Sequence, residues 1–240
     1  MHIFLAGAAG AIGRRLCPML IADGHQVTGT TRSVEKAQWL RSIGAEPVQL
    51  DIYDAEAVRR AIVDARPDVV MHQLTDLPQH YSAESIAAAL PGNARIRDIG
   101  TRNLVAAAVA AGATRLVAQS IAFSVSPALI AFERQILDAP PPVVTAIVLR
   151  YGAFYGPGTW RDAPGDAPPT VTWTRRRMPP AGRSLVAPAA SSSLPIRKTM
   201  TAIVRSASSV GNRTFVCRIS TGMLTKTRLL WLAAGLALWY

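Results

Sequence analysis

Acidic residues are missing from the last part of this 240-residue chain. Residues 1–166 contain 15 Lys and Arg and 15 Asp and Glu, whereas residues 167–240 contain 11 Lys and Arg and no acid. The whole formal net charge of +11 therefore belongs to the last part of the chain. Nucleic-acid-binding domains carry their basic excess on the folded domain itself. The balanced charge of the first part argues against that class, and we predict no nucleic-acid partner.

Cysteines and long apolar runs are also scarce. Cys17 and Cys217 are the only cysteines, so a disulfide framework or a cysteine metal cluster is excluded, and we predict no metal site. No run of 18 apolar residues is present, so no spanning helix is expected. The sequence opens on a strand pattern and not on a signal peptide. Together these absences predict a cytoplasmic protein without a membrane span.

The first sixteen residues combine a strand, a glycine turn and the start of a helix. An apolar run, Ile3 to Ala6, precedes glycines at positions 7, 10 and 13. Apolar residues then recur at positions 12, 16, 19 and 20, which is the spacing of one helix face. Glycines let the backbone approach a pyrophosphate, and the N–H groups of a helix N-terminus attract its charge. This context predicts a dinucleotide site, although three glycines could also make a merely flexible turn.

The remainder of the first part alternates strand and helix patterns. Strands are expected at 25–30, 47–50, 68–74, 115–119 and 143–149. Ser33, Asp54 and Asn93 are placed to cap the helices between them, with residues 76–92 as a loop or broken helix and the third cap opening a long helix to residue 111. A further helix is expected at 128–138. Repeated β-α units predict an α/β fold with a Rossmann-like, doubly wound parallel sheet.

Several of these segments resemble one enzyme family. The Gly-x-x-Gly-x-x-Gly spacing, the GTRNLV segment at 100–105 and the RYGAFYGPG segment at 150–158 are similar to those of the atypical and extended short-chain dehydrogenase/reductases, the NAD(P)-dependent epimerase/dehydratase family. The resemblance covers residues 1 to about 160. It implies an NAD(P)-binding Rossmann domain over residues 1–160.

Arg32 decides the expected cofactor. An acid after the second strand would accept hydrogen bonds from the ribose hydroxyls, whereas an arginine pairs with a 2′-phosphate. This chain has Arg32 and no acid there, which favours NADP(H) over NAD(H) unless Arg32 is an ordinary solvated residue at a helix start. The resemblance places Asp51 at the adenine amine, Ile52 beside the ring and residues 73–75 at the ribose and pyrophosphate. The expected cofactor-binding residues are Gly7, Ala9, Gly10, Ala11, Ile12, Gly13, Arg32, Asp51, Ile52, Gln73, Leu74, Thr75 and Ser120.

The catalytic pair that the resemblance implies is absent. The family uses a tyrosine followed by a lysine four positions later, and none of the five tyrosines has that lysine. An unaided phenol has a pKa near 10 and cannot act as a base at neutral pH. Ser120, after the fifth strand, and Tyr151, after the sixth, are the remaining catalytic candidates, each with a structural role as the alternative. His72 lies inside a strand and is predicted to be a core histidine.

Residues 161–240 form the second region. Residues 161–195 are rich in Pro, Ala, Ser and Arg, which is typical of irregular structure. Residues 196–240 could form a strand and an apolar end that docks on the domain or lies on a membrane surface. We therefore expect an irregular basic tail over 161–240, a degenerate or truncated substrate-binding part.

The sequence thus predicts an NAD(P)-dependent oxidoreductase or epimerase/dehydratase-like protein. It would bind a dinucleotide and act on a small-molecule substrate by hydride transfer. The alternative is a non-catalytic NAD(P)-binding sensor or regulator that lacks the Tyr-Lys pair.

Overall fold

A computed structural model describes residues 1–78, 82–122, 126–155, 170–172, 199–208 and 211–220. Most of residues 161–195 and the chain after residue 220, which includes the expected apolar end, lie outside these residues. Among the residues described, no helix is both long enough and apolar enough to cross a membrane.

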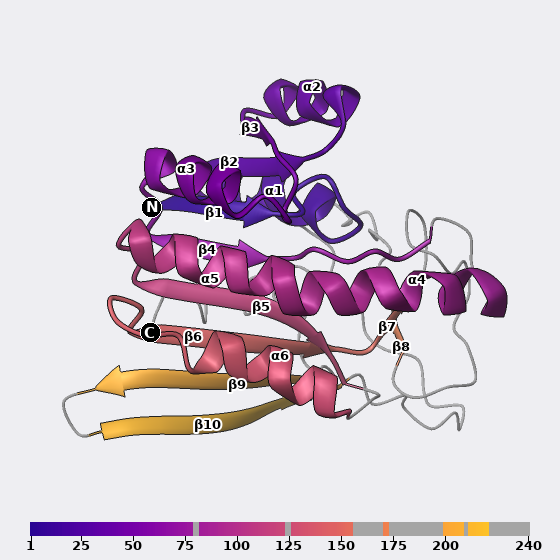
Figure 1. The fold of residues 1–240 in the computed structure, drawn as a ribbon, viewed down its shortest axis with the longest axis vertical. Coiled ribbons are helices and arrows are strands. Elements are labelled where there is room, and N and C mark those ends of the chain that lie inside the picture. The colour runs from indigo at the N-terminus through magenta and orange to yellow at the C-terminus, as the bar shows by residue number, and fades with distance from the viewer. Residues whose placement is uncertain (79–81, 123–125, 156–169, 173–198, 209–210, 221–240) are drawn as a thin grey trace, which may run out of the picture.

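An eight-stranded sheet organises the chain (Figure 1). Its order is β10-β9-β6-β5-β4-β1-β2-β3, and β1 to β6 are parallel. The order 3-2-1-4-5-6 of the parallel part is that of dinucleotide-binding folds, whose strand order reverses between β1 and β4. The predicted fold class is confirmed. These strands are β1 (His2–Ala6), β2 (Gln26–Thr31), β3 (Glu46–Gln49), β4 (Val69–His72), β5 (Arg115–Ile121) and β6 (Thr145–Tyr151).

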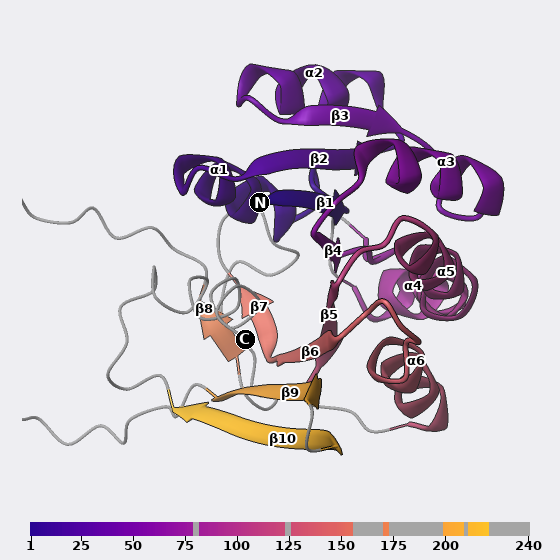
Figure 2. The ribbon, with the colours of Figure 1, turned by 90° about the vertical axis from the view of Figure 1, so that its left-hand side faces the viewer.

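Helices cover both faces of the sheet (Figure 2). Helix α1 (Gly13–Ala22) lies on one side, and α3 (Ala55–Ala65), α5 (Thr101–Ala110) and α6 (Pro127–Leu137) lie on the other. Helix α2 (Val34–Ser42) packs on the α1 side through Leu40. Alternate strand residues feed two separate cores: Ile3 and Leu5 pack toward α1, whereas Phe4 and Ala6 pack toward α3 and α5.

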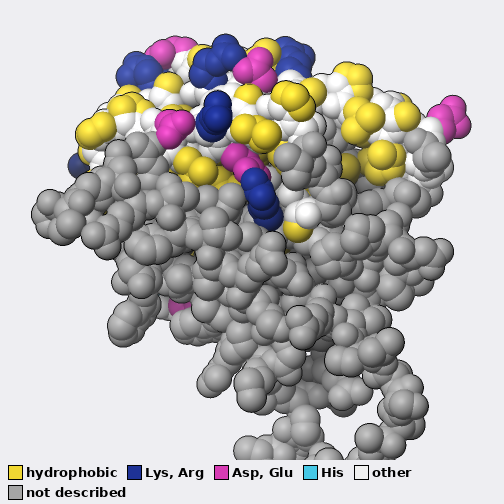
Figure 3. Space-filling view, turned by 90° about the horizontal axis from the view of Figure 1, so that it is seen from below, with side chains coloured by type: hydrophobic (Ala, Val, Ile, Leu, Met, Phe, Trp, Pro, Cys, Tyr) yellow, Lys and Arg dark blue, Asp and Glu magenta, His cyan; other side chains and the backbone are white. Residues whose placement is uncertain are grey.

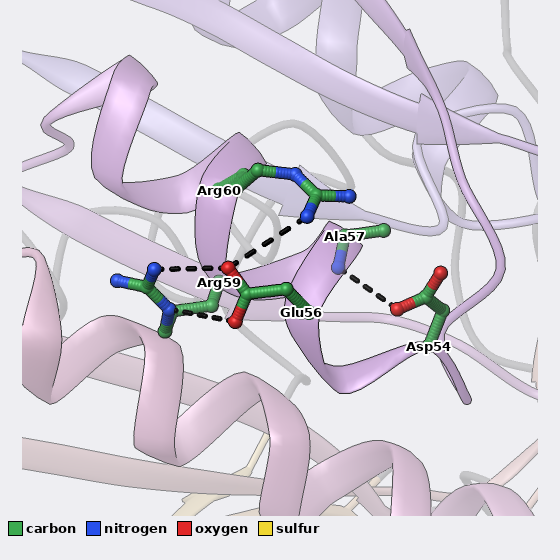
Figure 4. Close-up of polar contacts among 5 residues, drawn as sticks. All are labelled: Asp54, Glu56, Ala57, Arg59 and Arg60. Carbon is green, nitrogen blue, oxygen red and sulfur yellow. Dashed lines mark hydrogen bonds and ion pairs between the residues drawn. The ribbon is translucent and has the colours of Figure 1, made fainter.

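Local signals set several helix starts as predicted. The Ser33 hydroxyl accepts a hydrogen bond from the Lys36 N–H at 3.2 Å. The Asp54 carboxylate accepts from the Ala57 N–H at 2.9 Å, which opens α3 (Figure 4). Each cap satisfies an N–H group that would otherwise lack a partner at the helix start. Both predictions are confirmed.

The helix before residue 100 differs from the prediction. Helix α4 spans Ala83–Arg95 and begins at a capping box in which Ser82 and Ser85 bond to each other's backbone N–H groups. Asn93 is therefore not a cap. Its side chain instead bonds the backbone of Asp76 and Ala89. Pro91 lies inside the helix and does not end it. A π turn, η1 (Ile96–Gly100), joins α4 to α5, and α4 projects beyond the carboxyl ends of the strands (Figure 1).

Four further strands lie in or next to the segment expected to be irregular. Strand β9 (Thr199–Ser208) pairs antiparallel with β6, and β10 (Gly211–Ser220) pairs antiparallel with β9. Strands β7 (Ala153–Tyr155) and β8 (Thr170–Thr172) form a separate parallel pair. Residues 161–240 are thus regular in part, and their ten-residue strands extend the main sheet.

Candidate functional site

The glycine turn lies at the carboxyl end of β1, against the end of β4. Gly7 has a φ of +88°, and its N–H donates to the Thr30 hydroxyl at 3.1 Å. A Cβ at Gly7 would stand 2.8 Å from the Gln73 carbonyl oxygen, and a Cβ at Gly13 would stand 2.3 Å from the Gly7 carbonyl oxygen. Side chains at these two positions would therefore open the turn. Glycine is required because the turn is packed backbone against backbone.

The N–H groups at this turn are suited to an anion. Among the residues described, nothing accepts a hydrogen bond from the N–H of Ala11 or Ile12, which immediately precede α1. Gly10 and Ala11 are exposed. A helix N-terminus with free N–H groups attracts phosphate through both hydrogen bonding and the helix dipole. The cradle therefore fits a pyrophosphate.

Arg14 and Arg15 add positive charge to the same turn. The Arg14 Nε donates to the Ala9 carbonyl at 3.2 Å, and the Arg15 Nη1 donates to the Ala11 carbonyl at 2.9 Å. Burial and the neighbouring Arg14 charge both lower the pKa of Arg15. Both arginine side chains therefore hydrogen-bond to carbonyl oxygens of the turn. Among the residues described, the N–H groups of Ala11 and Ile12 keep no acceptor.

The ends of β2 and β3 supply a second polar region. Arg32 is exposed directly after β2. Asp51 is exposed after β3, and its Oδ1 accepts from the Tyr53 N–H at 3.0 Å. Ile52 is buried, with its carbonyl oxygen accepting from the Asn103 side chain at 2.9 Å. These positions put a cation, a carboxylate and an apolar side chain just after β2 and β3, the two strands that follow β1 in the sheet.

A stacked pair at this region was not predicted from the sequence. The Arg95 guanidinium lies 3.9 Å from the centre of the Tyr53 ring. Burial is the larger influence on the Tyr53 phenol and raises its pKa, against the lowering effect of Arg95. The two residues are far apart in sequence, and no local pattern brings an arginine of α4 to the end of β3.

Residues 73–75 follow β4 directly. The Gln73 side chain is only 6% exposed, and its Oε1 has no hydrogen-bond partner within the described part of the chain. The Leu74 N–H donates to the His72 Nδ1 at 3.2 Å, and the Leu74 carbonyl accepts from the Gln119 amide at 3.4 Å. Thr75 is exposed. A buried acceptor of this kind is open to a donor from water or from a bound molecule.

His72 is the core histidine that the sequence predicts. It is 3% exposed, and its Nε2 lies 3.0 Å from the Thr101 hydroxyl. Because the Nδ1 accepts from Leu74, the neutral ring carries its proton on Nε2 and donates it to Thr101. Burial, helped by the Arg97 charge, lowers the pKa of His72 to about 4. Both ring nitrogens thus make hydrogen bonds, one to the segment after β4 and one to the start of α5.

Ser120 and Tyr151, the catalytic candidates, face opposite sides of the sheet. The Ser120 hydroxyl donates to Glu133 of α6 at 2.6 Å. Tyr151 packs against the core on the α1 side. Burial raises the pKa of its phenol, and a hydrogen bond with Gln73 lowers it by less. The structure does not bring the two hydroxyls together. Ser120 pairs with Arg150, and Tyr151 is the next residue along β6, so its side chain lies on the opposite face of the sheet.

A buried charge cluster behind Ser120 was missed by the sequence analysis. Glu133 is 4% exposed and accepts from the Arg150 Nε at 2.8 Å and its Nη2 at 2.5 Å. These bonds raise the pKa of Arg150. A signal was available: Glu133 lies on the same face of α6 as the buried Leu129, Phe132 and Ile136. A carboxylate on a buried apolar stripe requires a partner.

Comparisons with known proteins agree with this geometry. A protein-family model described as NAD(P)H-binding matches residues 7–137. A 3-diazoavenalumate denitrifying reductase from a Streptomyces species is 40% identical over 182 residues, 66% of this chain and 58% of that protein. A UDP-glucose 4-epimerase from Mycolicibacterium smegmatis is 32% identical over 130 residues, 52% of this chain and 40% of that protein. The chain thus spans little more than half the length of the first relative, and less of the second.

Solved structures share the fold. A UDP-glucose 4-epimerase from Thermotoga maritima, with UDP-glucose, has a TM-score of 0.54 at 22% identity, covering 66% of this chain and 57% of that chain. The Bordetella bronchiseptica enzyme WbmH, in complex with NAD+, has a TM-score of 0.51 at 19% identity, covering the same shares. The resemblance predicted from the glycine spacing is confirmed. These findings support a nicotinamide dinucleotide as the cofactor.

Proposed function

Because this chain belongs to the NAD(P)H-binding family, we propose that it is an NAD(P)H-dependent oxidoreductase that acts on a small molecule by hydride transfer. The observation that carries the proposal is the glycine turn, whose free N–H groups precede a helix at the carboxyl end of β1. The reductase and epimerase names of the curated relatives support the same reaction class.

Different residues of the chain would bind different parts of the cofactor. The turn, Gly7 to Gly13, would hold the diphosphate, and Asp51 and Ile52 the adenine end. Gln73, Leu74 and Thr75 would line the ribose and the pyrophosphate, and the buried Gln73 Oε1 has no partner among described residues. The Ser120 hydroxyl is bound to Glu133, which places it at the end of β5 with its side chain engaged.

Arg32 would select NADPH. Its exposed guanidinium directly follows β2, where a 2′-phosphate needs a partner and where the chain has no competing acid. Arginine binds phosphate with paired, charge-assisted hydrogen bonds. We therefore place the preference for NADP(H) over NAD(H) on this single side chain.

The bound nicotinamide ring would supply the hydride. Tyr151 would supply a hydrogen bond, because burial holds its pKa above the ordinary value and keeps the phenol protonated. A protonated phenol donates to a substrate oxygen and does not remove a proton from one. Residues 161–240 would contribute a shortened substrate-binding part.

A non-catalytic NAD(P)H-binding regulator is the second candidate. It is favoured by the absence of the Tyr-x-x-x-Lys pair and by the opposed directions of Ser120 and Tyr151. Turnover of NADPH with a panel of ketones, aldehydes and diazo compounds separates the two. Consumption of NADPH supports the enzyme, whereas tight NADPH binding without any turnover supports the regulator.

The cofactor preference is tested with Arg32→Ala. We expect the affinity for NADPH to fall roughly tenfold or more, because a charge-assisted hydrogen bond contributes about 1.5–3 kcal/mol, and the affinity for NADH to stay unchanged. Titration followed by calorimetry measures both. Arg41→Ala, an exposed arginine in the last turn of α2, is the matched control. An equal loss for both cofactors would remove the proposed role of Arg32.

A further inference from the structure

Gln73 lies at the carboxyl edge of the sheet with one end of its side-chain amide unsatisfied. The residue is 6% exposed, and its Oε1 is buried without a hydrogen-bond partner within the described part of the chain. Its backbone is fixed beside the glycine turn, because its N–H donates to the Ala6 carbonyl at 2.9 Å and a Cβ at Gly7 would stand 2.8 Å from its carbonyl oxygen. A buried amide oxygen without a donor destabilises the protein, so a donor from outside the chain would be favourable here.

The other end of the same amide is engaged by Tyr151. Met71 packs on the α1 side of the sheet, and Gln73, two positions later, extends from the same face. Tyr151 packs on that face at the end of β6, and the two side chains hydrogen-bond to each other. Because Oε1 has no partner among the residues described, this bond is donated by the Gln73 Nε2 to the phenol oxygen. The Tyr151 bond thereby sets the orientation of the amide.

The Gln73 amide lies farther along the sheet than the glycine turn. Strand β4 is next to β1, and β6 lies two strands beyond β4. Since Gln73 extends from the end of β4 and meets a side chain of β6, their contact lies near β5, two strand spacings from the turn, which is about 10 Å. In a dinucleotide the ribose directly follows the diphosphate and the nicotinamide ring comes next. The ring, more than its ribose, reaches this distance.

The nicotinamide carboxamide carries the group that the Gln73 oxygen lacks. A primary amide presents two N–H donors beside one carbonyl acceptor. The diphosphate offers acceptors alone and would leave Oε1 unsatisfied. The adenine amine is a donor, but the adenine end is expected beside Asp51, which follows β3 on the other side of β1. The carboxamide is thus the donor of the cofactor that fits this position.

We propose that Gln73 binds the carboxamide of the nicotinamide ring, its Oε1 accepting a hydrogen bond from the carboxamide N–H. The proposal deepens the proposed function and rests on it for the identity of the cofactor. Gln73 is then a specificity-determining residue for the ring, and its bond to Tyr151 fixes which end of its amide faces the ring. The hydride-carrying ring and the phenol are held by the same side chain.

The test compares three dinucleotides that differ only at the carboxamide. It starts from NADP+ or NAD+, whichever the full chain binds more tightly, and measures affinity by calorimetry. The thionicotinamide analogue keeps the N–H donors and replaces the oxygen by sulfur, whereas the 3-acetylpyridine analogue replaces the NH2 group by a methyl group. We expect the parent dinucleotide and the thionicotinamide analogue to bind at least fivefold more tightly than the 3-acetylpyridine analogue, since one hydrogen bond to a buried acceptor accounts for such a ratio.

Variants of Gln73 assign this preference to its side chain. Gln73→Met keeps the length and removes both ends of the amide, so it should abolish the preference. Gln73→Glu keeps an acceptor oxygen and should restore part of it. Gln135→Met is the matched control, because the Gln135 Oε1 is also buried without a partner among described residues, but on α6, across the sheet from α1. Melting temperatures of all three variants confirm that each is folded.

Nonspecific attraction of the phosphates would not produce a preference at the carboxamide. The described side chains seen in Figure 3 also intersperse basic, acidic and hydrophobic groups without a continuous basic patch.

The outcomes separate this inference from the proposed function. Equal affinities of the wild type for the three dinucleotides would overturn the role of Gln73 and leave the oxidoreductase proposal standing. A preference that survives in Gln73→Met would also overturn it, because another group would then bind the carboxamide. Loss of the preference in Gln135→Met as well would assign it to a general change in the protein and reject the proposal. Binding of none of the dinucleotides would refute the proposed function together with this inference.

Discussion

Glu133 offers the sharpest test of the charge cluster at the carboxyl edge. Glu133→Gln keeps the size of the side chain and removes its charge. Breaking a fully buried ion pair costs about 3–5 kcal/mol, since it leaves the other charge unpaired. The Arg150 side chain is 28% exposed, so water recovers part of that cost. We expect a loss of about 2–3 kcal/mol in the free energy of unfolding. For a chain of this size that lowers the melting temperature by roughly 4–12 °C.

Urea unfolding followed by circular dichroism measures the loss, and differential scanning fluorimetry gives the melting temperature. Glu56→Gln is the matched control, because Glu56 also meets two arginines, Arg59 and Arg60, but on the exposed surface of α3 (Figure 4). Its free energy of unfolding should stay within experimental error of the wild type, since solvent screens such pairs. Equal losses of stability in the two variants, or no loss in Glu133→Gln, would refute the inference that burial makes the Glu133–Arg150 pair stabilising.

The other predictions concern the glycine turn and His72. Gly13→Ala places a Cβ 2.3 Å from the Gly7 carbonyl oxygen. We therefore expect lower stability and at least tenfold weaker NADPH binding, both measured by thermal shift with and without NADPH. Normal NADPH binding by this variant would contradict the tight packing of the turn. The unfolded chain protonates His72 near pH 6.5 and the folded chain only near pH 4. Its stabilising contribution is therefore full above pH 6.5 and lost as the pH falls through that window, by about 2 kcal/mol at pH 5. Urea unfolding at pH 7 and pH 5 should show a smaller pH dependence in His72→Gln, and an unchanged dependence would exclude His72 as the source.

Local signals in the sequence predicted most of the first part. The glycine spacing and the alternation of strands and helices predicted the doubly wound parallel sheet, because short right-handed crossovers leave few topologies open. The caps Ser33 and Asp54 were predictable because each acts within three residues. His72 was predicted as a core residue because it stands inside an apolar strand, and its neighbours there are buried.

Contacts between residues that are far apart along the chain could not be predicted from the sequence. Asn93 has the chemistry of a cap, but a serine eleven positions earlier started the helix and left its amide to bond Asp76. Glu133 meets Arg150 only once α6 packs over β5 and β6. The pairing of β9 with β6 joins segments about fifty positions apart. Each of these depends on the assembled sheet, and no single window of sequence contains both partners.

The hairpin of β9 and β10 has a consequence for synthesis on the ribosome. Strand β6 hydrogen-bonds to β5 on one side and to β9 on the other. A nascent chain that has just released β6 still lacks β9, and at roughly 5–20 residues per second the wait lasts a few seconds. Throughout that interval the N–H and C=O groups of β6 that later bond β9 are open to pairing with another extended polypeptide. Pairing with β9 ends this exposure of β6 and moves that edge of the sheet to β10.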